Sequence, residues 1–230
     1  MTQLKRLGKE SHRKTFIRHG APPECIFGVP VGDLKPIQKK IKKNYELALE
    51  LFDTGNADAQ YLAGLIADEN QMKRSDLNKW ARTAAWSMIS CSTVAGVAAD
   101  SPHAVALGLK WIDSKQEKIA KVGWPTLGGY CSVTPDDEID LNVFEGLLDR
   151  VVREIHGERN EVKDVMNSFV MSVGCYVAPL TKAALRTAKE IGKVEVDVGD
   201  TSCKIHVAED YIKKVEGMGR IGKKRKTARC

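Results

Sequence analysis

Residues 28–68, GVPVGDLKPIQKKIKKNYELALELFDTGNADAQYLAGLIAD, set the pattern for the rest of the chain. They predict three short helices joined by tight turns, with Pro36 at the start of the first and Gly55 at the end of the second. Apolar side chains recur on one face of the second helix (Leu47, Leu51, Phe52) and of the third (Leu62, Leu65, Ile66). Such helices bury an apolar stripe only against one another and their neighbours, which predicts a helical repeat.

The helical periodicity continues beyond this stretch. We expect helices at 75–84, 86–99, 101–112, 115–130, 136–155, 160–177 and 180–191. A proline and three glycines between 123 and 129 predict a kink or a break in the segment 115–130. Helices that follow one another through loops of a few residues favour an α-solenoid over a closed bundle.

Residues 193–207, KVEVDVGDTSCKIHV, depart from the helical pattern. Val194, Val196 and Val198 alternate with charged residues, and Gly199-Asp200 supplies a turn, which together predict a β-hairpin. An isolated hairpin is only marginally stable in water, so we expect its valine face to pack on helices. Whether it covers the open end of the solenoid or projects to meet a ligand stays open at this point.

Charge is concentrated at the two ends of the chain. Residues 1–43 hold 11 Lys or Arg against 3 acidic residues, and residues 217–230, GMGRIGKKRKTARC, hold 6 against none. The whole chain carries only +6, so residues 44–216 are net acidic. A polyanion would therefore bind at the ends. The alternative is a solvated surface followed by a disordered basic tail, 217–230.

Several classes of protein are disfavoured by what the sequence lacks. The six cysteines, at 25, 91, 131, 175, 203 and 230, show no CxxC spacing, so we expect reduced thiols and neither a disulfide set nor a zinc site. There is no HExxH motif or phosphate-binding glycine loop, and we expect no metal and no cofactor. No apolar run reaches the ~20 residues that span a bilayer. We expect a cytoplasmic monomer, with a transit peptide at residues 1–20 as the alternative.

Three pieces of the opening stretch, GVPVGDLKPIQKKI, NYELALELFDTGN and DAQYLAGLIAD, carry a family resemblance in their order and spacing. The chain resembles the DNA alkylation repair family, whose founding members are alkylpurine DNA glycosylases, and the similarity extends more weakly to about Ala188. The resemblance implies an all-α fold, an α-α superhelix of HEAT-like (ARM-type) repeats in a single domain, 1–216. It also implies DNA, damaged or branched, as the partner.

The resemblance also implies where an active site would lie. Glycosylases of this family place a tryptophan and, four positions later, an aspartate on one helix face, with an arginine from a neighbouring repeat. Trp86 matches the tryptophan, but Ser90 stands at the aspartate and Lys121 at the arginine. A second expected tryptophan is matched by Cys175. A serine lacks the negative charge that stabilises a developing sugar cation, so we expect little or no glycosylase activity. Trp86 as a simple core residue is the alternative.

The cations expected to contact DNA lie in the first helices, at the matched position 121, in the hairpin and in the tail. With Trp86, they are Lys35, Lys39, Lys42, Lys43, Lys121, Lys204, Arg220, Lys223, Lys224, Arg225 and Lys226. We expect them to bind phosphates and DNA shape. Two other functions stay open: an active alkylpurine glycosylase that uses other residues or bound water, and a scaffold that binds protein partners on a concave face.

Overall fold

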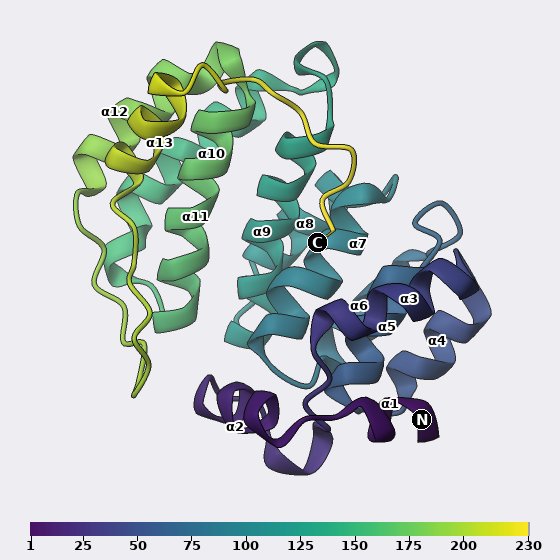
Figure 1. The fold of residues 1–230 in the computed structure, drawn as a ribbon. Coiled ribbons are helices and arrows are strands. Elements are labelled where there is room, and N and C mark those ends of the chain that lie inside the picture. Colours follow the sequence, from purple (N-terminus) through teal and green to yellow (C-terminus); the bar gives the residue numbers. More distant parts are fainter. Residues whose placement is uncertain (230) are drawn as a thin grey trace.

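The structure is a computed structural model that describes residues 1–229, so Cys230, the last residue of the predicted tail, lies outside the described residues. The fold is helical throughout that range, with no strand in it (Figure 1), which confirms the all-α expectation. The α-helices are α1 Thr2–Leu7, α2 Glu10–Arg18, α3 Val31–Ile41, α4 Tyr45–Asp53, α5 Ala57–Ile66, α6 Arg74–Thr83, α7 Ala95–Asp100, α8 Ala104–Ile112, α9 Glu117–Val133, α10 Leu141–Glu154, α11 Asn160–Tyr176, α12 Thr181–Ile191 and α13 Ala208–Gly217. A π-helical segment, Ile89–Val94, leads directly into α7.

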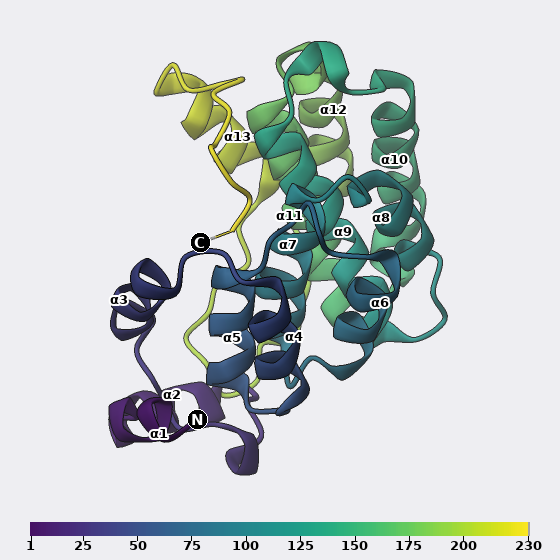
Figure 2. The ribbon, with the colours of Figure 1, turned by 90° about the vertical axis from the view of Figure 1, so that its right-hand side faces the viewer.

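The helices form two layers. In Figure 2, α5, α7, α9 and α11 lie on the side of the C-terminus, and α4, α6, α8 and α10 lie to their right, away from it. α9 contacts α7 and α11, and α5 contacts the π-helical segment that leads into α7; the outer helices α4, α8 and α10 contact α5, α9 and α11. We call the side formed by α5, α7, α9, α11 and α13 the inner face. Stacked helix pairs of this kind are the arrangement that the sequence predicts.

Two apolar clusters form the core, one in each half of the chain. In the first, the rings of Phe52 and Trp80 stack with their centroids 4.1 Å apart. In the second, Trp124 and Phe169 meet edge to face at 5.1 Å. The periodic apolar residues of the sequence supply both clusters, so packing between helix pairs determines the fold.

One buried carboxylate links the start of the opening stretch to α5. Asp58, at the start of α5, accepts hydrogen bonds from the backbone N–H groups of Phe27, Gly28 and Val29 at 2.6, 3.2 and 2.7 Å. Gly28 has φ +81°, and a Cβ there would lie 2.5 Å from the backbone nitrogen of Arg13. Only glycine fits this position, which holds α2 and α3 against the first repeat.

Two prolines lie inside helices, and both differ from the prediction. Pro36 was expected at a helix start, but α3 begins at Val31 and is preceded by Pro30. Pro125 does not break the segment 115–130, which belongs to one continuous helix, α9. A proline at 125 removes the hydrogen bond to the carbonyl of Lys121. The Cys91 thiol donates to that carbonyl instead, at 3.8 Å, so tertiary packing replaces the missing helical bond.

The predicted β-hairpin at 193–207 is wrong. The chain does run out from α12 and back to α13 (Figure 1), but no strand forms in this segment. Its backbone bonds to side chains of α11 instead: Asn160 exchanges two 2.8 Å hydrogen bonds with the backbone of Asp197, and Asn167 donates to the carbonyl of His206 at 2.8 Å. The expected inward face is nevertheless present, because Val194 is buried in the second cluster.

The described residues contain no single helix long and apolar enough to cross a membrane. α11 and the segment Ala178–Ile191 meet the length and composition criteria as a pair, with a bend of 114° between them.

Candidate nucleic-acid interface

The chain after α13 crosses the C-terminal ends of the inner helices and ends beside α7 (Figure 1). Within this tail, the N–H of Gly222 donates to the carbonyl of Cys175 at 2.9 Å, and the N–H of Arg225 donates to that of Ser132 at 2.7 Å. Lys224 Nζ donates to the carbonyl of Cys131 at 3.0 Å. Final helical turns leave carbonyls unpaired and carry partial negative charge. The basic tail supplies N–H donors to these carbonyls and positive charge to these helix ends. The tail is therefore bound to the fold.

Arg229 anchors the far end of the tail. Its side chain is 13% exposed, Nε donates to Asp100 Oδ2 at 2.8 Å, and Nη2 donates to Glu69 Oε2 at 2.6 Å. Nη1 also donates to the carbonyl of Ala67 at 2.9 Å, which lies just after α5. A buried guanidinium needs such a set of partners. Arg229 is absent from the residues predicted to bind DNA. Its partners lie so far away in the sequence that no local pattern indicates its role as an anchor.

A hollow of about 480 Å³ lies between α9, α11, α13 and the tail, and we call it the tail hollow. Arg220, Lys223 and Arg225 supply its charge. Small residues form its floor: Gly128, Gly129, Ser132, Ser168 and Ser172. Within residues 1–229 no aspartate or glutamate lines it. The tail's ion pairs in that range use Lys224 and Arg229. Arg220, Lys223 and Arg225 therefore have no ion-pair partner among residues 1–229 and can bind an anion.

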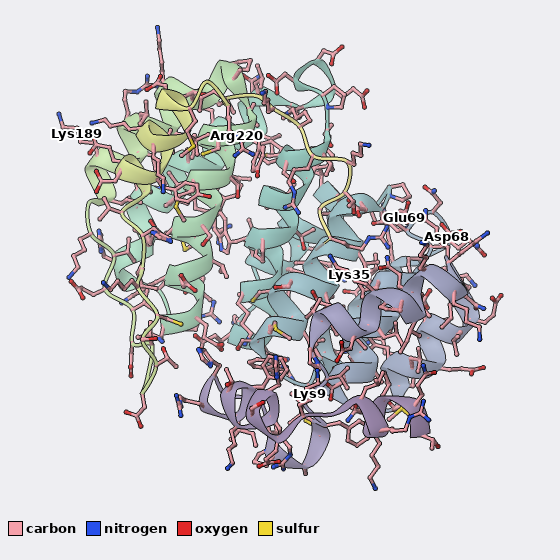
Figure 3. The ribbon with its side chains drawn as sticks, in the orientation of Figure 1. Lys9, Lys35, Asp68, Glu69, Lys189 and Arg220 are labelled. Atoms are coloured by element: carbon pink, nitrogen blue, oxygen red, sulfur yellow. The ribbon has the colours of Figure 1, made fainter. Side chains whose placement is uncertain are left out.

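A second hollow, of about 590 Å³, lies between α3, the end of α5 and the end of the tail, and we call it the α3 hollow. Lys39, Lys42 and Lys43 line it, together with Arg229 and Thr227. Over the described part of the chain it too has no acidic lining residue. The two hollows lie beside successive parts of the tail: Arg220, Lys223 and Arg225 line the tail hollow, and Thr227 and Arg229 line the α3 hollow. Figure 3 labels Arg220, in the first of these parts, and Lys35 on α3.

Lys42 has a backbone conformation that L-residues rarely adopt. It ends α3 with φ 62° and ψ −144°. The same position after α12 is Gly192, with φ 57° and ψ −139°. Glycine adopts this region without strain, whereas a side chain there costs about 1–3 kcal/mol. The lysine therefore stands where the backbone geometry calls for glycine.

The other predicted cations are dispersed. Lys35 and Lys226 are exposed outside both hollows, and Lys204 is exposed on the segment between α12 and α13. Lys224 pairs with Asp136 at 2.7 Å. Lys43 pairs with Glu69 at 2.5 Å while it lines the α3 hollow.

A second polar cluster lies at the N-terminal ends of the inner helices. Lys121 Nζ donates to both carboxylate oxygens of Glu161 and to Ser87 Oγ, each at 2.8 Å, and Ser87 Oγ donates to Glu161. Burial alone would raise the pKa of Glu161, but the hydrogen bonds from Lys121 and Ser87 outweigh it and hold the pKa below its ordinary value of 4.5. The Lys121 side chain is 7% exposed, so the pair is an internal link between α9 and α11.

Trp86 and Ser90 lie beside this cluster. Ser90 is buried at 4% exposure, and its Oγ donates to the carbonyl of Trp86 at 3.2 Å. The Trp86 ring packs on Phe16 with a centroid distance of 5.9 Å, and its side chain is half-buried. Its Nε1 is buried and has no hydrogen-bond partner among residues 1–229. The structure therefore bonds Lys121 to Ser87 and Cys91, the residues that follow Trp86 and Ser90.

The comparisons with known proteins identify the family. The family model of the DNA alkylation repair enzymes matches residues 1–185. The chain belongs to this family. Uncharacterized proteins of Listeria innocua and Listeria monocytogenes are 32% and 31% identical to it, each over 93% of this chain and 94% of the relative.

A solved structure resembles the whole fold of this DNA alkylation repair family member. It has a TM-score of 0.92 and 38% identity, and it covers 100% of this chain and 97% of its own. That protein is described as one of a new family related to the HEAT-like repeat DNA glycosylases, with affinity for branched DNA structures. The expected HEAT-like repeat architecture is thus confirmed.

The positions matched to the family's active site do not form one site in this member. Cys175 and Glu161 lie 14 positions apart on α11, which corresponds to about 21 Å at the helical rise. Cys175 lines the tail hollow, whereas Glu161 joins Lys121 and Ser87. Sequence reasoning missed Glu161 because it looked for a carboxylate on the helix of Trp86. The contact comes from a different repeat and leaves no local pattern.

Proposed function

We propose that this protein binds branched DNA through its inner face, by contacts to phosphates in the two hollows. The observation that carries the proposal is the pair of cationic hollows along the tail, each without an acidic lining residue in the described chain. Clustered cations attract the DNA backbone and release its counterions. The affinity for branched DNA described for the structural relative supports the same partner.

A branch point can contact both hollows at once. Two duplex arms diverge from it, so that one arm reaches the tail hollow while another reaches the α3 hollow. Once the first arm is bound, the second binds intramolecularly at a raised effective concentration. One chain supplies both hollows, so we propose that it acts as a monomer. We place it in the cytoplasm, the compartment in which thiols are kept reduced.

We further propose that it removes alkylated purines weakly or not at all. Ser90 is buried and neutral, and Lys121 is held by Glu161, so neither group is free to stabilise a sugar cation or grip a phosphate. One observation favours the alternative of an active glycosylase: the Glu161 side chain is 43% exposed beside Ser87, the residue after Trp86.

Excision of alkylated purines separates these two functions. Purified protein should release them from alkylated DNA at the uncatalysed rate, and Glu161→Gln should leave that rate unchanged. Rapid release by the wild type that Glu161→Gln abolishes would establish the alternative instead.

Charge-removing substitutions test the proposed binding surface. Lys39→Gln with Lys42→Gln removes the two cations of the α3 hollow that have no ion-pair partner in residues 1–229, and Lys223→Gln with Arg225→Gln removes two of the three cations of the tail hollow. Each pair should weaken binding to a four-way junction and flatten the log–log salt slope by about 1 per cation removed. Lys189→Gln is the control, because Lys189 is exposed on α12 and lines neither hollow (Figure 3). Equal losses for the control and the hollow variants would refute the proposal.

A further inference from the structure

The tail hollow has features that plain phosphate binding does not require. Besides its cations it is lined by the aromatic rings of Tyr176, Tyr211 and His206. Tyr211 is 40% exposed, which is unusual for a large side chain in this fold. Its ring lies against His206 at a centroid distance of 5.6 Å, tilted by 50°. An exposed aromatic pair beside unpaired cations is the combination that stacks a base and holds its phosphate.

The shape of the hollow favours a single nucleotide. Its volume of about 480 Å³ lies within the range of roughly 300–1,000 Å³ that is typical of small-ligand pockets. The small side chains of the glycines and serines of α9 and α11 leave this space open. α9 and α11 pack closely below it, since a Cβ on Gly128 would lie 3.0 Å from Ser172 Oγ. One base with its sugar fits such a space, whereas a paired duplex lies only across the mouth.

The tail determines where the charge lies. The Arg225 backbone is held by Ser132, and the Gly222 backbone by Cys175, on either side of Lys223. Arg220, Lys223 and Arg225 are therefore presented by a bound segment around one space. Holding like charges close together costs free energy that a bound anion recovers. A nucleotide phosphate at the rim and its base against Tyr211 would use both groups at once.

We propose that the tail hollow accepts one unpaired nucleotide at the branch point of the DNA. This inference rests on the proposed function and names what that site recognises: an unpaired nucleotide at a branch point, which a linear duplex lacks. Taking a nucleotide that is already unpaired avoids the cost of breaking a base pair. Tyr211 stacks on the base, and Arg220, Lys223 and Arg225 hold the adjoining phosphates.

The test uses two three-way junctions that differ only in one unpaired nucleotide at the branch point, with a linear duplex as reference. The full-length protein should bind the junction with the unpaired nucleotide about tenfold more tightly than the fully paired one, the effect expected of one stacked base. With 2-aminopurine as the unpaired nucleotide, fluorescence should fall on binding. Tyr211→Ala should remove the tenfold advantage and the fluorescence change, while Tyr211→Phe should retain both.

A second variant tests the inference in case Tyr211→Ala does not fold. Lys223→Gln changes an exposed side chain of the same hollow and should reduce the advantage of the unpaired nucleotide more than it reduces binding to duplex. Equal affinity for the two junctions, both tighter than duplex, would overturn the inference and leave branched-DNA binding intact. Equal affinity for junctions and duplex would refute the proposed function itself.

Discussion

Lys42 is the residue at which stability and binding are in conflict. Its φ of 62° is the single positive value for a non-glycine residue within positions 1–229, and its side chain lines the α3 hollow. A lysine kept at a strained position adjacent to a cationic hollow indicates a role in binding rather than in folding.

We therefore expect Lys42→Gly to stabilise the protein by about 1–3 kcal/mol while it weakens binding to branched DNA. Chemical denaturation and a binding titration on the same preparation measure the two effects. Lys42→Gln is the matched control: it removes the charge and keeps the strain, so it should lose affinity without gaining stability. A glycine variant that is no more stable than the glutamine variant would show that the backbone is not strained.

Glu161 makes a different prediction, because it neutralises a buried lysine. Glu161→Gln should lower the free energy of unfolding by roughly 1–3 kcal/mol, less than for a fully buried pair because Glu161 is 43% exposed. Glu209→Gln, which breaks the exposed pair with Lys213, should change it by less than about 0.5 kcal/mol.

The effect of Glu161 should depend on pH in a defined direction. Its pKa in the folded protein lies below the ordinary value of 4.5, so its contribution is complete above that value and is lost as the pH falls through the folded pKa. The stability difference between wild type and Glu161→Gln should thus be constant at neutral pH and shrink under acid conditions. A difference that grows as the pH falls would mean that the carboxylate is not stabilised by Lys121.

Among the elements, the tail is the one whose state the sequence left open. The composition of 217–230 allowed a disordered, solvated end, but the structure shows a segment held on the ends of α5, α9 and α11. Arg229→Gln would leave Glu69 and Asp100 without their guanidinium, and we expect a loss of about 2–4 kcal/mol. Lys226→Gln, exposed on the same segment, should leave stability within about 0.5 kcal/mol.

Urea unfolding of the Arg229 and Lys226 variants compares them directly, and hydrogen exchange at the Arg225 amide reports whether the tail stays bound. Identical unfolding curves together with unchanged protection at Arg225 would contradict an anchored tail. The tail hollow would then lack the fixed wall that its recognition of DNA requires.

The helices could be predicted from the sequence because their cause is local. The spacing of Phe52, Leu62 and Ile66 predicts buried faces, and the structure buries all three residues. The segment 193–207 shows where local reasoning fails. Alternation correctly predicts that Val194 points inward, but the hydrogen-bond partner that replaces a second strand, Asn160, lies 37 positions away from Asp197.

The site was less predictable than the fold for the same reason. Arg229 and Glu69 are separated by 160 positions, and Lys121 and Glu161 by 40. No spacing rule connects residues from different repeats, whose proximity depends on how the inner helices stack. Apart from Arg229, the cations that line the hollows were predicted from the sequence, whereas the grouping of Lys39 with Lys42, and of Lys223 with Arg225, required the structure.

The molecule as a unit presents one inner face with two cationic hollows along the tail, and the account depends on both hollows engaging one DNA. The decisive experiment is a competition titration of the wild-type protein between a four-way junction and a linear duplex that contains the same arms. We predict a preference for the junction of at least about tenfold, because the second hollow binds intramolecularly. The Lys223→Gln, Arg225→Gln variant should lose this preference and should lose less affinity for the duplex than for the junction. Equal affinity of the wild type for junction and duplex would contradict the account.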